Sequence, residues 1–175
     1  MDHHDHVNLL RGGISRPEGV WADFGSGSGA FTFALAELIQ TTGMIFSIDT
    51  DRSALRHQEA SMKDRFSKAN VQYIHADYTR KIILPPLDGI IAANTLHFHF
   101  EKYPILNLFL GYLKSSGRMI LVEYNVDRGN MWVPYPFSYP EWVKIAKRSG
   151  FRETCLLARR PSHFLKEIYS ALSIK

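Results

Sequence analysis

The sequence predicts an α/β fold in which a parallel β-sheet is covered by helices on both faces. Three observations support this prediction. Short apolar runs alternate with amphipathic stretches as far as Tyr124, a glycine-rich loop follows the first apolar run, and turn residues separate the later elements. Strands that alternate with helices favour a parallel sheet, because each strand returns to the same edge of the sheet through a helix.

The apolar runs and amphipathic stretches give the expected elements in chain order. Strands are expected at Gly19–Phe24, Met44–Ile48, Val71–His75, Leu87–Ala93 and Arg118–Tyr124, and helices at Phe31–Ile39, Ser53–Phe66 and Tyr103–Leu113. In the first helix, apolar residues recur at helical spacing. Ser115–Gly117 is expected as a turn before the fifth strand. Beyond the aromatic loop 126–140 we expect a helix at Glu141–Ser149 and an antiparallel hairpin of Phe151–Ala158 and His163–Leu172, joined by residues 159–162.

Length and composition indicate one globular domain spanning residues 1–175. The chain is 45% hydrophobic and only 22% charged, which argues against disorder. Its single cysteine, Cys155, excludes an intrachain disulfide and is expected to be a small buried residue. No apolar stretch approaches the roughly 18 residues of a membrane span, so a cytoplasmic protein without a membrane partner is expected.

The charge is unevenly distributed. The chain carries 21 Lys and Arg against 17 Asp and Glu, a net charge of +4, and residues 143–175 hold eight Lys or Arg against two Glu. A basic region can attract phosphate backbones. Here the cations stand singly among apolar residues, so a small-molecule substrate is favoured over nucleic acid, which stays open as an alternative. The oligomeric state is not predicted.

The N-terminal segment Met1–Pro17 precedes the first expected strand and is a candidate lid. It contains His3, His4, Asp5 and His6, whose side chains can bind metals. At a chain end such a cluster is typical of a disordered polar lead, and we expect no metal site.

The glycine-rich loop is the most informative segment. In Val20–Ala30 an expected strand leads into Gly25, Gly27 and Gly29 and then into a helix. Glycine permits backbone angles closed to other residues and close approach of a ligand, and a helix start offers unpaired N–H donors. The loop therefore indicates a nucleotide-type site. Gly25, Gly27 and Ala30 also fit the dinucleotide pattern, so the loop alone does not choose between cofactors.

Polar residues at the ends of later strands complete the predicted site. Asp49 ends the second strand and can accept hydrogen bonds from two ribose hydroxyls, whereas Asp51 is better suited to capping the next helix. Asp77 follows the third strand, where it could accept from an adenine amino group, and Asn94 follows the fourth. Ligands of open parallel sheets bind outside the carboxyl ends of the strands, so these residues should converge.

These motifs, in this order, resemble a class I S-adenosylmethionine-dependent methyltransferase. The matching segments are Asp23–Gly29, Asp49, Asp77–Tyr78, Asn94–His97 and Gly117–Tyr124. The resemblance implies a three-layer sandwich around a mostly parallel seven-stranded sheet in the order 3-2-1-4-5-7-6, with the last strand antiparallel. It also implies S-adenosyl-L-methionine as cofactor and S-adenosyl-L-homocysteine as product. The implied cofactor-binding residues are Asp23, Gly25, Ser26, Gly27, Gly29, Asp49, Thr50, Asp77, Tyr78, Asn94 and Thr95.

The segment after the fourth strand bears on the acceptor. Enzymes of this family that methylate base amines carry two prolines and an aromatic residue after the first Asn or Asp, whereas this chain reads Asn94-Thr95-Leu96-His97. Cytosine C5 methylation needs a cysteine nucleophile, and Cys155 is expected away from this edge. Leu96-His97 and the strand ending at Tyr124 are similar to the small-molecule branch, which includes quinone-biosynthesis-like methyltransferases.

We therefore expect in-line methyl transfer to a small acceptor, hydrophobic or aromatic. His97 and Glu123 are the candidate catalytic residues for an acceptor that must lose a proton, although Glu123 could instead pair with Arg128. The candidate substrate-binding residues are His99, Tyr124, Trp132, Tyr135 and Phe137. The alternatives left open are an RNA-modifying methyltransferase, a non-catalytic cofactor-binding module and, more remotely, an NAD-dependent oxidoreductase.

Overall fold

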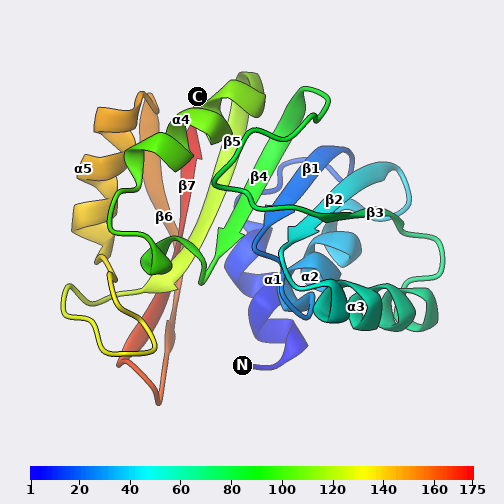
Figure 1. The fold of residues 1–175 in the computed structure, drawn as a ribbon, viewed down its shortest axis with the longest axis horizontal. Coiled ribbons are helices and arrows are strands. Elements are labelled where there is room, and N and C mark those ends of the chain that lie inside the picture. Colours follow the sequence, from blue (N-terminus) through cyan, green and yellow to red (C-terminus); the bar gives the residue numbers. More distant parts are fainter.

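A computed structural model describes residues 1–175 and contains one seven-stranded sheet in the order β3-β2-β1-β4-β5-β7-β6 (Figure 1). The strands are β1 (Gly19–Phe24), β2 (Gly43–Asp49), β3 (Asn70–His75), β4 (Leu87–Ala93), β5 (Leu113–Tyr124), β6 (Glu153–Pro161) and β7 (Glu167–Ile174). The helices are α1 (His3–Arg11), α2 (Ala30–Ile39), α3 (Arg52–Arg65), η1 (Leu96–Phe98), α4 (Tyr103–Tyr112) and α5 (Tyr139–Ser149).

Only β7 runs against the other strands. The pairs β1–β2, β1–β4, β2–β3 and β4–β5 are parallel, and β7 is antiparallel to both β5 and β6. This order and direction confirm the predicted fold. In Figure 1 the parallel strands run downward, so their carboxyl ends form the lower edge of the sheet.

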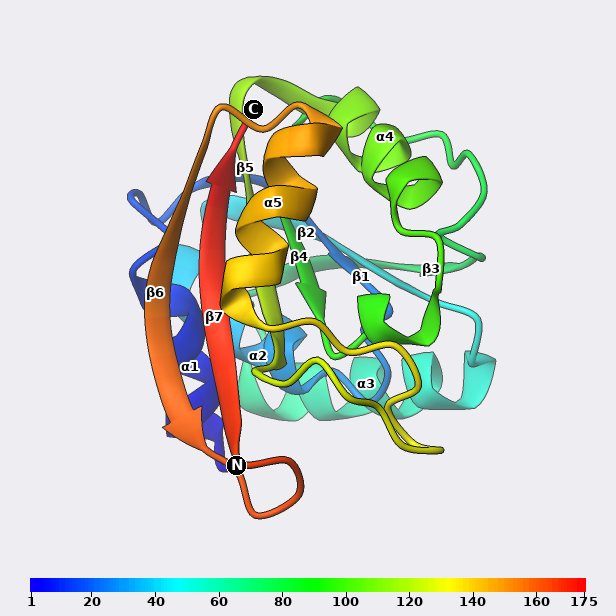
Figure 2. The ribbon, with the colours of Figure 1, turned by 90° about the vertical axis from the view of Figure 1, so that its left-hand side faces the viewer.

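Helices cover both faces of the sheet and bury two hydrophobic cores. One core joins Leu106 and Phe109 of α4 and Trp142 of α5 to alternate side chains of the strands. The other joins Leu10 of α1 and Leu35 of α2 to the opposite face. Figure 2 shows α1 and α5 on opposite sides of the edge formed by β6 and β7.

The N-terminal segment differs from the expectation of a disordered lead. Asp2 caps α1 by accepting a hydrogen bond from the Asp5 N–H at 2.9 Å, and Val7, Leu9 and Leu10 are buried against α2 and the sheet. The expectation was wrong because polar residues at the start of α1 masked the apolar residues of its buried face. The function of this segment as a lid stays a prediction.

Two strand boundaries and one side chain also differ from expectation. The expected turn Ser115–Gly117 lies inside β5, where a register shift against β4 forms a bulge and Ser116 has φ +134°. β6 continues to Pro161, so the hairpin turn falls at residues 162–166. Cys155 is exposed on β6, not buried, because β6 is an edge strand of the sheet.

No helix is long and apolar enough to cross a bilayer.

Candidate functional site

The glycine loop lies at the carboxyl end of β1 and has a left-handed backbone at its three glycines. The φ angles of Gly25, Gly27 and Gly29 are +73°, +52° and +90°. A Cβ atom on Gly25 would lie 2.1 Å from the Thr95 hydroxyl, and one on Gly29 would lie 2.3 Å from Gln58 Cγ. A Cβ on Gly27 would meet nothing within 4 Å. Gly27 is therefore the glycine whose Cα faces open space.

The carboxylates of Asp49 and Asp51 shape the loops beside the glycines. Asp49 Oδ2 accepts a hydrogen bond from the Gly27 N–H at 2.7 Å, and its Oδ1 accepts from the Asp51 N–H at 2.8 Å. Asp51 caps α3, as expected, by accepting from the Ser53 and Ala54 N–H groups, which lowers the pKa of its carboxyl. Asp49 thus contacts the glycine loop although it lies 22 residues after Gly27 in the sequence.

Asn94 follows β4 in an unusual backbone conformation. Its φ is +51°, and its N–H donates to the Val122 carbonyl at 2.8 Å. Its side-chain Oδ1 is buried without a hydrogen-bond partner. A buried acceptor without a donor is costly, so this atom points to a ligand that supplies one.

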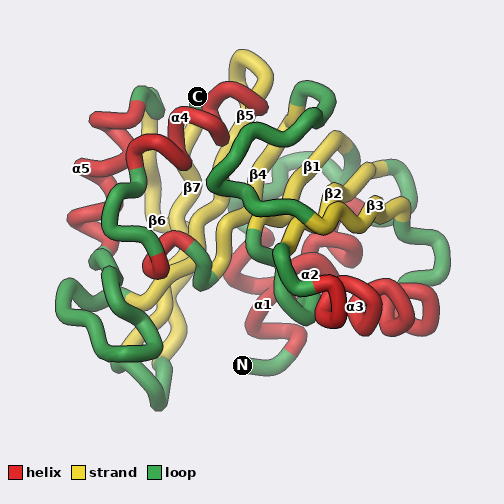
Figure 3. The backbone as a smooth tube through the Cα atoms, in the orientation of Figure 1, coloured by secondary structure: helices red, strands yellow, loops and turns green.

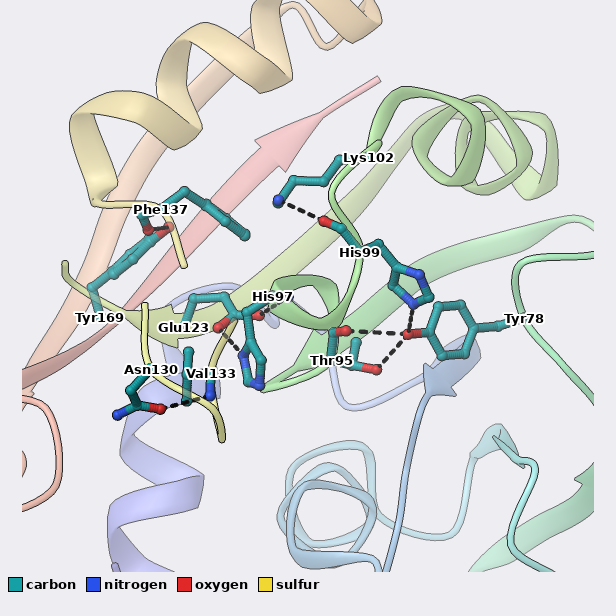
Figure 4. Close-up of polar contacts among 10 residues, drawn as sticks. All are labelled: Tyr78, Thr95, His97, His99, Lys102, Glu123, Asn130, Val133, Phe137 and Tyr169. Carbon is teal, nitrogen blue, oxygen red and sulfur yellow. Dashed lines mark hydrogen bonds and ion pairs between the residues drawn. The ribbon is translucent and has the colours of Figure 1, made fainter. Parts of the chain in front are cut away.

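Tyr78 connects the loops after β3 and β4. Its hydroxyl lies 2.6 Å from His99 Nε2 and 3.0 Å from the Thr95 hydroxyl, which donates to it (Figure 4). Burial raises the pKa of Tyr78 to about 12 and lowers the pKa of His99. Tyr78 therefore stays protonated, and together with Thr95 it closes the side of the loop next to Gly25.

A hollow of about 510 Å³ opens beside Asp77. Asp77 Oδ1 accepts from the Thr79 hydroxyl at 2.7 Å and from the Thr79 N–H at 2.9 Å, and these hydrogen bonds lower the pKa of the carboxyl. Oδ2 lies 3.6 Å from the Arg80 guanidinium. The hollow is lined by Thr50, Asp77, Tyr78, Thr79, His99, Glu101, Pro104 and Ile105. Its size and polar lining suit a nucleoside.

His97 and Glu123 form a buried pair at the ends of β4 and β5. Glu123 is fully buried, and its Oε2 lies 2.7 Å from His97 Nδ1 (Figure 4). Its Oε1 also accepts from the His97 backbone N–H at 3.2 Å. The carboxylate favours the tautomer with hydrogen on Nδ1, which leaves a lone pair on Nε2, a nitrogen without a partner in the protein. Glu123 pairs with His97 and not with Arg128, the alternative left open above.

The aromatic loop 126–138 lies at the same edge of the sheet, among the loops seen at the lower left in Figure 3. The Tyr135 N–H donates to the His97 carbonyl at 2.9 Å, and Trp132 and Tyr135 are exposed. Phe137 is only 2% exposed and packs against Trp142 at 5.9 Å between ring centroids. Phe137 therefore belongs to the core, which corrects the expectation that it faces a substrate.

Three polar residues beside the site were not predicted. Gln58 of α3 donates to the Gly27 carbonyl at 3.2 Å and accepts from the Ser47 hydroxyl at 2.7 Å. Thr32 donates to the buried Asp23 at 2.6 Å. Gln58 and Ser47 are separated from the loop in sequence, so the order of motifs carries no signal for them. Thr32 lies in the first turn of α2, only nine residues after Asp23, so this pairing could have been considered from the sequence.

A hollow larger than the one beside Asp77 lies at the opposite edge of the sheet. It measures about 610 Å³ and is lined by residues at the amino ends of the strands, including Gly19, Asp88 and Arg118. None of the residues predicted for the site lines it, and ligands of parallel sheets bind at the carboxyl ends. No group of three or more His, Cys, Asp or Glu side chains is placed to hold a metal ion.

Comparison with known proteins assigns the family. The family model described as a methyltransferase domain matches residues 17–171. A curated relative, the ubiquinone/menaquinone biosynthesis C-methyltransferase UbiE of Azotobacter vinelandii, is 27% identical over 123 residues, which are 67% of this chain and 48% of that protein. The chain thus spans about half the length of the curated relatives it matches.

Solved structures share the fold at low sequence identity. The YcgJ protein of Bacillus subtilis has a TM-score of 0.79 at 12% identity, with 99% of each chain covered. The 1,6-didemethyltoxoflavin-N1-methyltransferase of Burkholderia thailandensis has a TM-score of 0.77 at 18% identity, covering 99% of this chain and 77% of that one. Fold and family model agree: the chain belongs to the methyltransferase domain family, and its class is the class I, S-adenosylmethionine-dependent type.

Proposed function

We propose that this domain binds S-adenosylmethionine along the edge formed by Gly25–Gly29, Asp49, Asp77 and Asn94. The open space at Gly27 carries this proposal, because Asp49, whose carboxylate suits ribose hydroxyls, lies directly against this glycine at the carboxyl edge of the sheet. The partnerless Asn94 Oδ1 offers an acceptor for the ammonium or methyl end of the same molecule. Asp23, Ser26, Thr50, Tyr78 and Thr95 would support the loops around it.

The proposed acceptor is small and apolar or aromatic. S-adenosylmethionine supplies an electrophilic methyl group, so the protein mainly has to align the acceptor and exclude water. Trp132, Tyr135 and Tyr124 present aromatic surface at this edge. The curated relatives are named as C-methyltransferases of ubiquinone and menaquinone biosynthesis, and this supports an acceptor related to quinones.

His97 is proposed to accept the proton that such an acceptor loses. Its Nε2 lone pair is available because Glu123 holds the hydrogen on Nδ1. When Nε2 takes a proton the imidazolium lies 2.7 Å from a buried carboxylate, which stabilises its charge. His99 lies beside the hollow and would help to orient the acceptor or the cofactor.

Cofactor binding can be tested without knowing the acceptor. Isothermal calorimetry with S-adenosylhomocysteine should show one site per chain, and Asp49→Ala should abolish it. The Asp49→Ala chain must retain the circular dichroism spectrum of the parent chain. Undiminished binding by a folded Asp49→Ala chain would refute the assignment of this carboxylate.

The acceptor and the base can be tested with probe molecules. We expect formation of S-adenosylhomocysteine with a hydroquinone, a catechol or a phenol, and little with an aliphatic amine. Glu123→Gln and His97→Asn should each lower kcat about 100-fold and leave the affinity for S-adenosylhomocysteine unchanged. His57→Asn, on the exposed side of α3, is the matched control and should leave kcat unchanged. Equal kcat in all four chains would exclude the His97–Glu123 pair from the reaction.

A further inference from the structure

Exposed apolar side chains are concentrated at one place on the molecule. Nine large hydrophobic residues are exposed, and six of them lie on η1 or on loops at the carboxyl edge of the sheet. These six form what we call the apolar rim: Phe98, Phe100, Met131, Trp132, Tyr135 and Phe164. Scattered exposed hydrophobic residues need no explanation, but a group at one edge indicates an interaction surface.

Contacts around His97 connect the parts of the apolar rim. The Phe100 and Tyr135 rings meet edge to face at 5.4 Å between centroids, and the Phe98 ring lies 4.3 Å from that of His97. On the other side, Phe164 lies 5.8 Å from Tyr124. The apolar rim therefore borders the proposed acceptor site.

The most exposed part of the apolar rim is a fixed turn. Asn130 Oδ1 accepts hydrogen bonds from the N–H groups of Trp132 and Val133, both at 2.9 Å, and the Val133 side chain is buried. Between these anchors Met131 is 84% and Trp132 68% exposed. The turn thus holds two large apolar side chains outward, although nothing in the chain covers them.

The loops that carry the apolar rim have a small positive excess. Segments 98–102, 125–138 and 159–167 contain Lys102, Arg128, Arg159, Arg160 and Lys166 against Glu101, Asp127 and Glu167, so five minus three gives +2. Arg160 is paired with Asp5 of α1, and Arg159 lies 3.7 Å from Glu167. Arg128 and Lys166 are exposed, have no carboxylate partner, and lie within four residues of Trp132 and Phe164 in the sequence.

We propose that the apolar rim docks on the surface of a lipid bilayer that contains anionic lipids. Trp and Tyr favour the boundary between headgroups and acyl chains, and nearby Arg and Lys are attracted to anionic headgroups. A protruding turn with two outward side chains suits insertion into a fluid layer better than a self-complementary contact with a second copy, which requires a matching surface. The purpose of docking rests on the proposed function: a hydrophobic acceptor would enter the site directly from the lipid.

Tryptophan fluorescence provides a direct test. Trp21 and Trp142 are buried, so Trp132 is the exposed tryptophan and reports on its own surroundings. Vesicles of phosphatidylcholine with phosphatidylglycerol should shift the emission of the full chain to shorter wavelength and sediment with the protein. Vesicles of phosphatidylcholine alone should bind more weakly, and lipids brominated in the acyl chain should quench the emission.

Substitutions separate docking from the proposed function. The double variant Met131→Ser, Trp132→Ser should reduce sedimentation with vesicles by about tenfold or more. The matched control is Ile83→Ser, which removes an even more exposed apolar side chain, on the segment between β3 and β4 and outside the apolar rim, and should leave sedimentation unchanged. The proposal would be overturned if the vesicles neither sedimented with the parent chain nor shifted the emission of its Trp132. It would also be overturned if sedimentation equilibrium showed a dimer that the double variant abolishes. Because neither readout needs methyl transfer, failure of docking leaves the test with S-adenosylhomocysteine unaffected.

Discussion

At the scale of single residues, the most informative charge is one that the fold buries. Asp23 is the penultimate residue of β1, is 1% exposed, and receives one hydrogen bond, from Thr32 at 2.6 Å. Burial raises the pKa of its carboxyl to about 7 from 3.8. Such a residue is retained at a cost in stability, because the folded chain must keep the proton or bury a charge. Its place two residues before Gly25 suggests that it serves the loop.

Asp23→Asn should therefore stabilise the chain more at high pH than at low pH. Below pH 4 the carboxyl is protonated in both states, and between pH 4 and 7 only the folded state keeps the proton, so the stability of the parent chain falls as pH rises. Above pH 7 the penalty is constant. Relative to the parent, the free energy of unfolding of Asp23→Asn should rise by about 2 kcal/mol from pH 5 to pH 8.

Urea unfolding at the two pH values measures this difference. Asp64→Asn, on the exposed face of α3, is the control and should change the stability equally at both pH values. A constant difference between Asp23→Asn and the parent would show that Asp23 is ionised in the folded chain throughout this range.

The position of a residue in the site could be predicted where it follows directly from the order of strands and helices. It could not be predicted where side chains from distant elements contact each other. Asp49, Asp77 and Asn94 follow apolar runs, so the parallel sheet places them at one edge. Nothing in the spacing indicates that Gln58 packs on Gly29 or that Phe137 turns inward onto Trp142. Those contacts depend on how α3 and α5 pack against the sheet.

At the scale of elements, the glycine loop combines two different requirements for glycine. Gly29 begins α2 with no side-chain cap, and Gln58 occupies the position where its Cβ would lie. Gly27 is held by Asp49 but has open space beside it. One glycine is thus required by packing and the other by the space next to the loop.

Alanine at Gly29 should mainly lower the stability of the chain, whereas alanine at Gly27 should mainly weaken cofactor binding. Gly29→Ala should lower the free energy of unfolding by about 3 kcal/mol, because it combines a positive φ with a clash. Gly27→Ala should lower it by only about 1 kcal/mol, yet weaken S-adenosylhomocysteine binding at least about tenfold by filling the open space. Urea unfolding and calorimetry on both variants measure the two effects. Equal loss of affinity at equal loss of stability would remove Gly27 from the proposed site.

The elements themselves were mostly predictable, and the exceptions share a cause. Strands β1 and β4 have the predicted bounds, since apolar runs ended by turn residues are strong signals. Helix α1 was missed because only one stripe of it is apolar and its first turn is polar. The bulge in β5 was taken as a turn because serine and glycine at Ser115–Gly117 suit both.

At the scale of the whole molecule, the two edges of the sheet differ in kind. The carboxyl edge gathers the glycine loop, the partnerless Asn94 Oδ1, the His97–Glu123 pair and the apolar rim. The amino edge holds the larger of the two hollows, but there Asp88 already pairs with Lys114 at 2.7 Å and accepts from the Val20 N–H. By volume alone the cofactor site would be assigned to the amino edge. The unpaired Asn94 Oδ1 and the parallel direction of the strands favour the carboxyl edge instead.

Hydrogen exchange with and without S-adenosylhomocysteine distinguishes the two edges in one experiment. A ligand at about 100 times its Kd stabilises the folded state by about 2.7 kcal/mol, and amides that it contacts are slowed further by loss of local opening. We expect the strongest protection at residues 25–30, 49–51, 77–79 and 94–97, and none beyond the global change at residues 15–19 and 114–118. Those amino-edge segments serve as the internal control. Protection confined to them would place the cofactor in the larger hollow and reject the site assigned here, even though the family would stand.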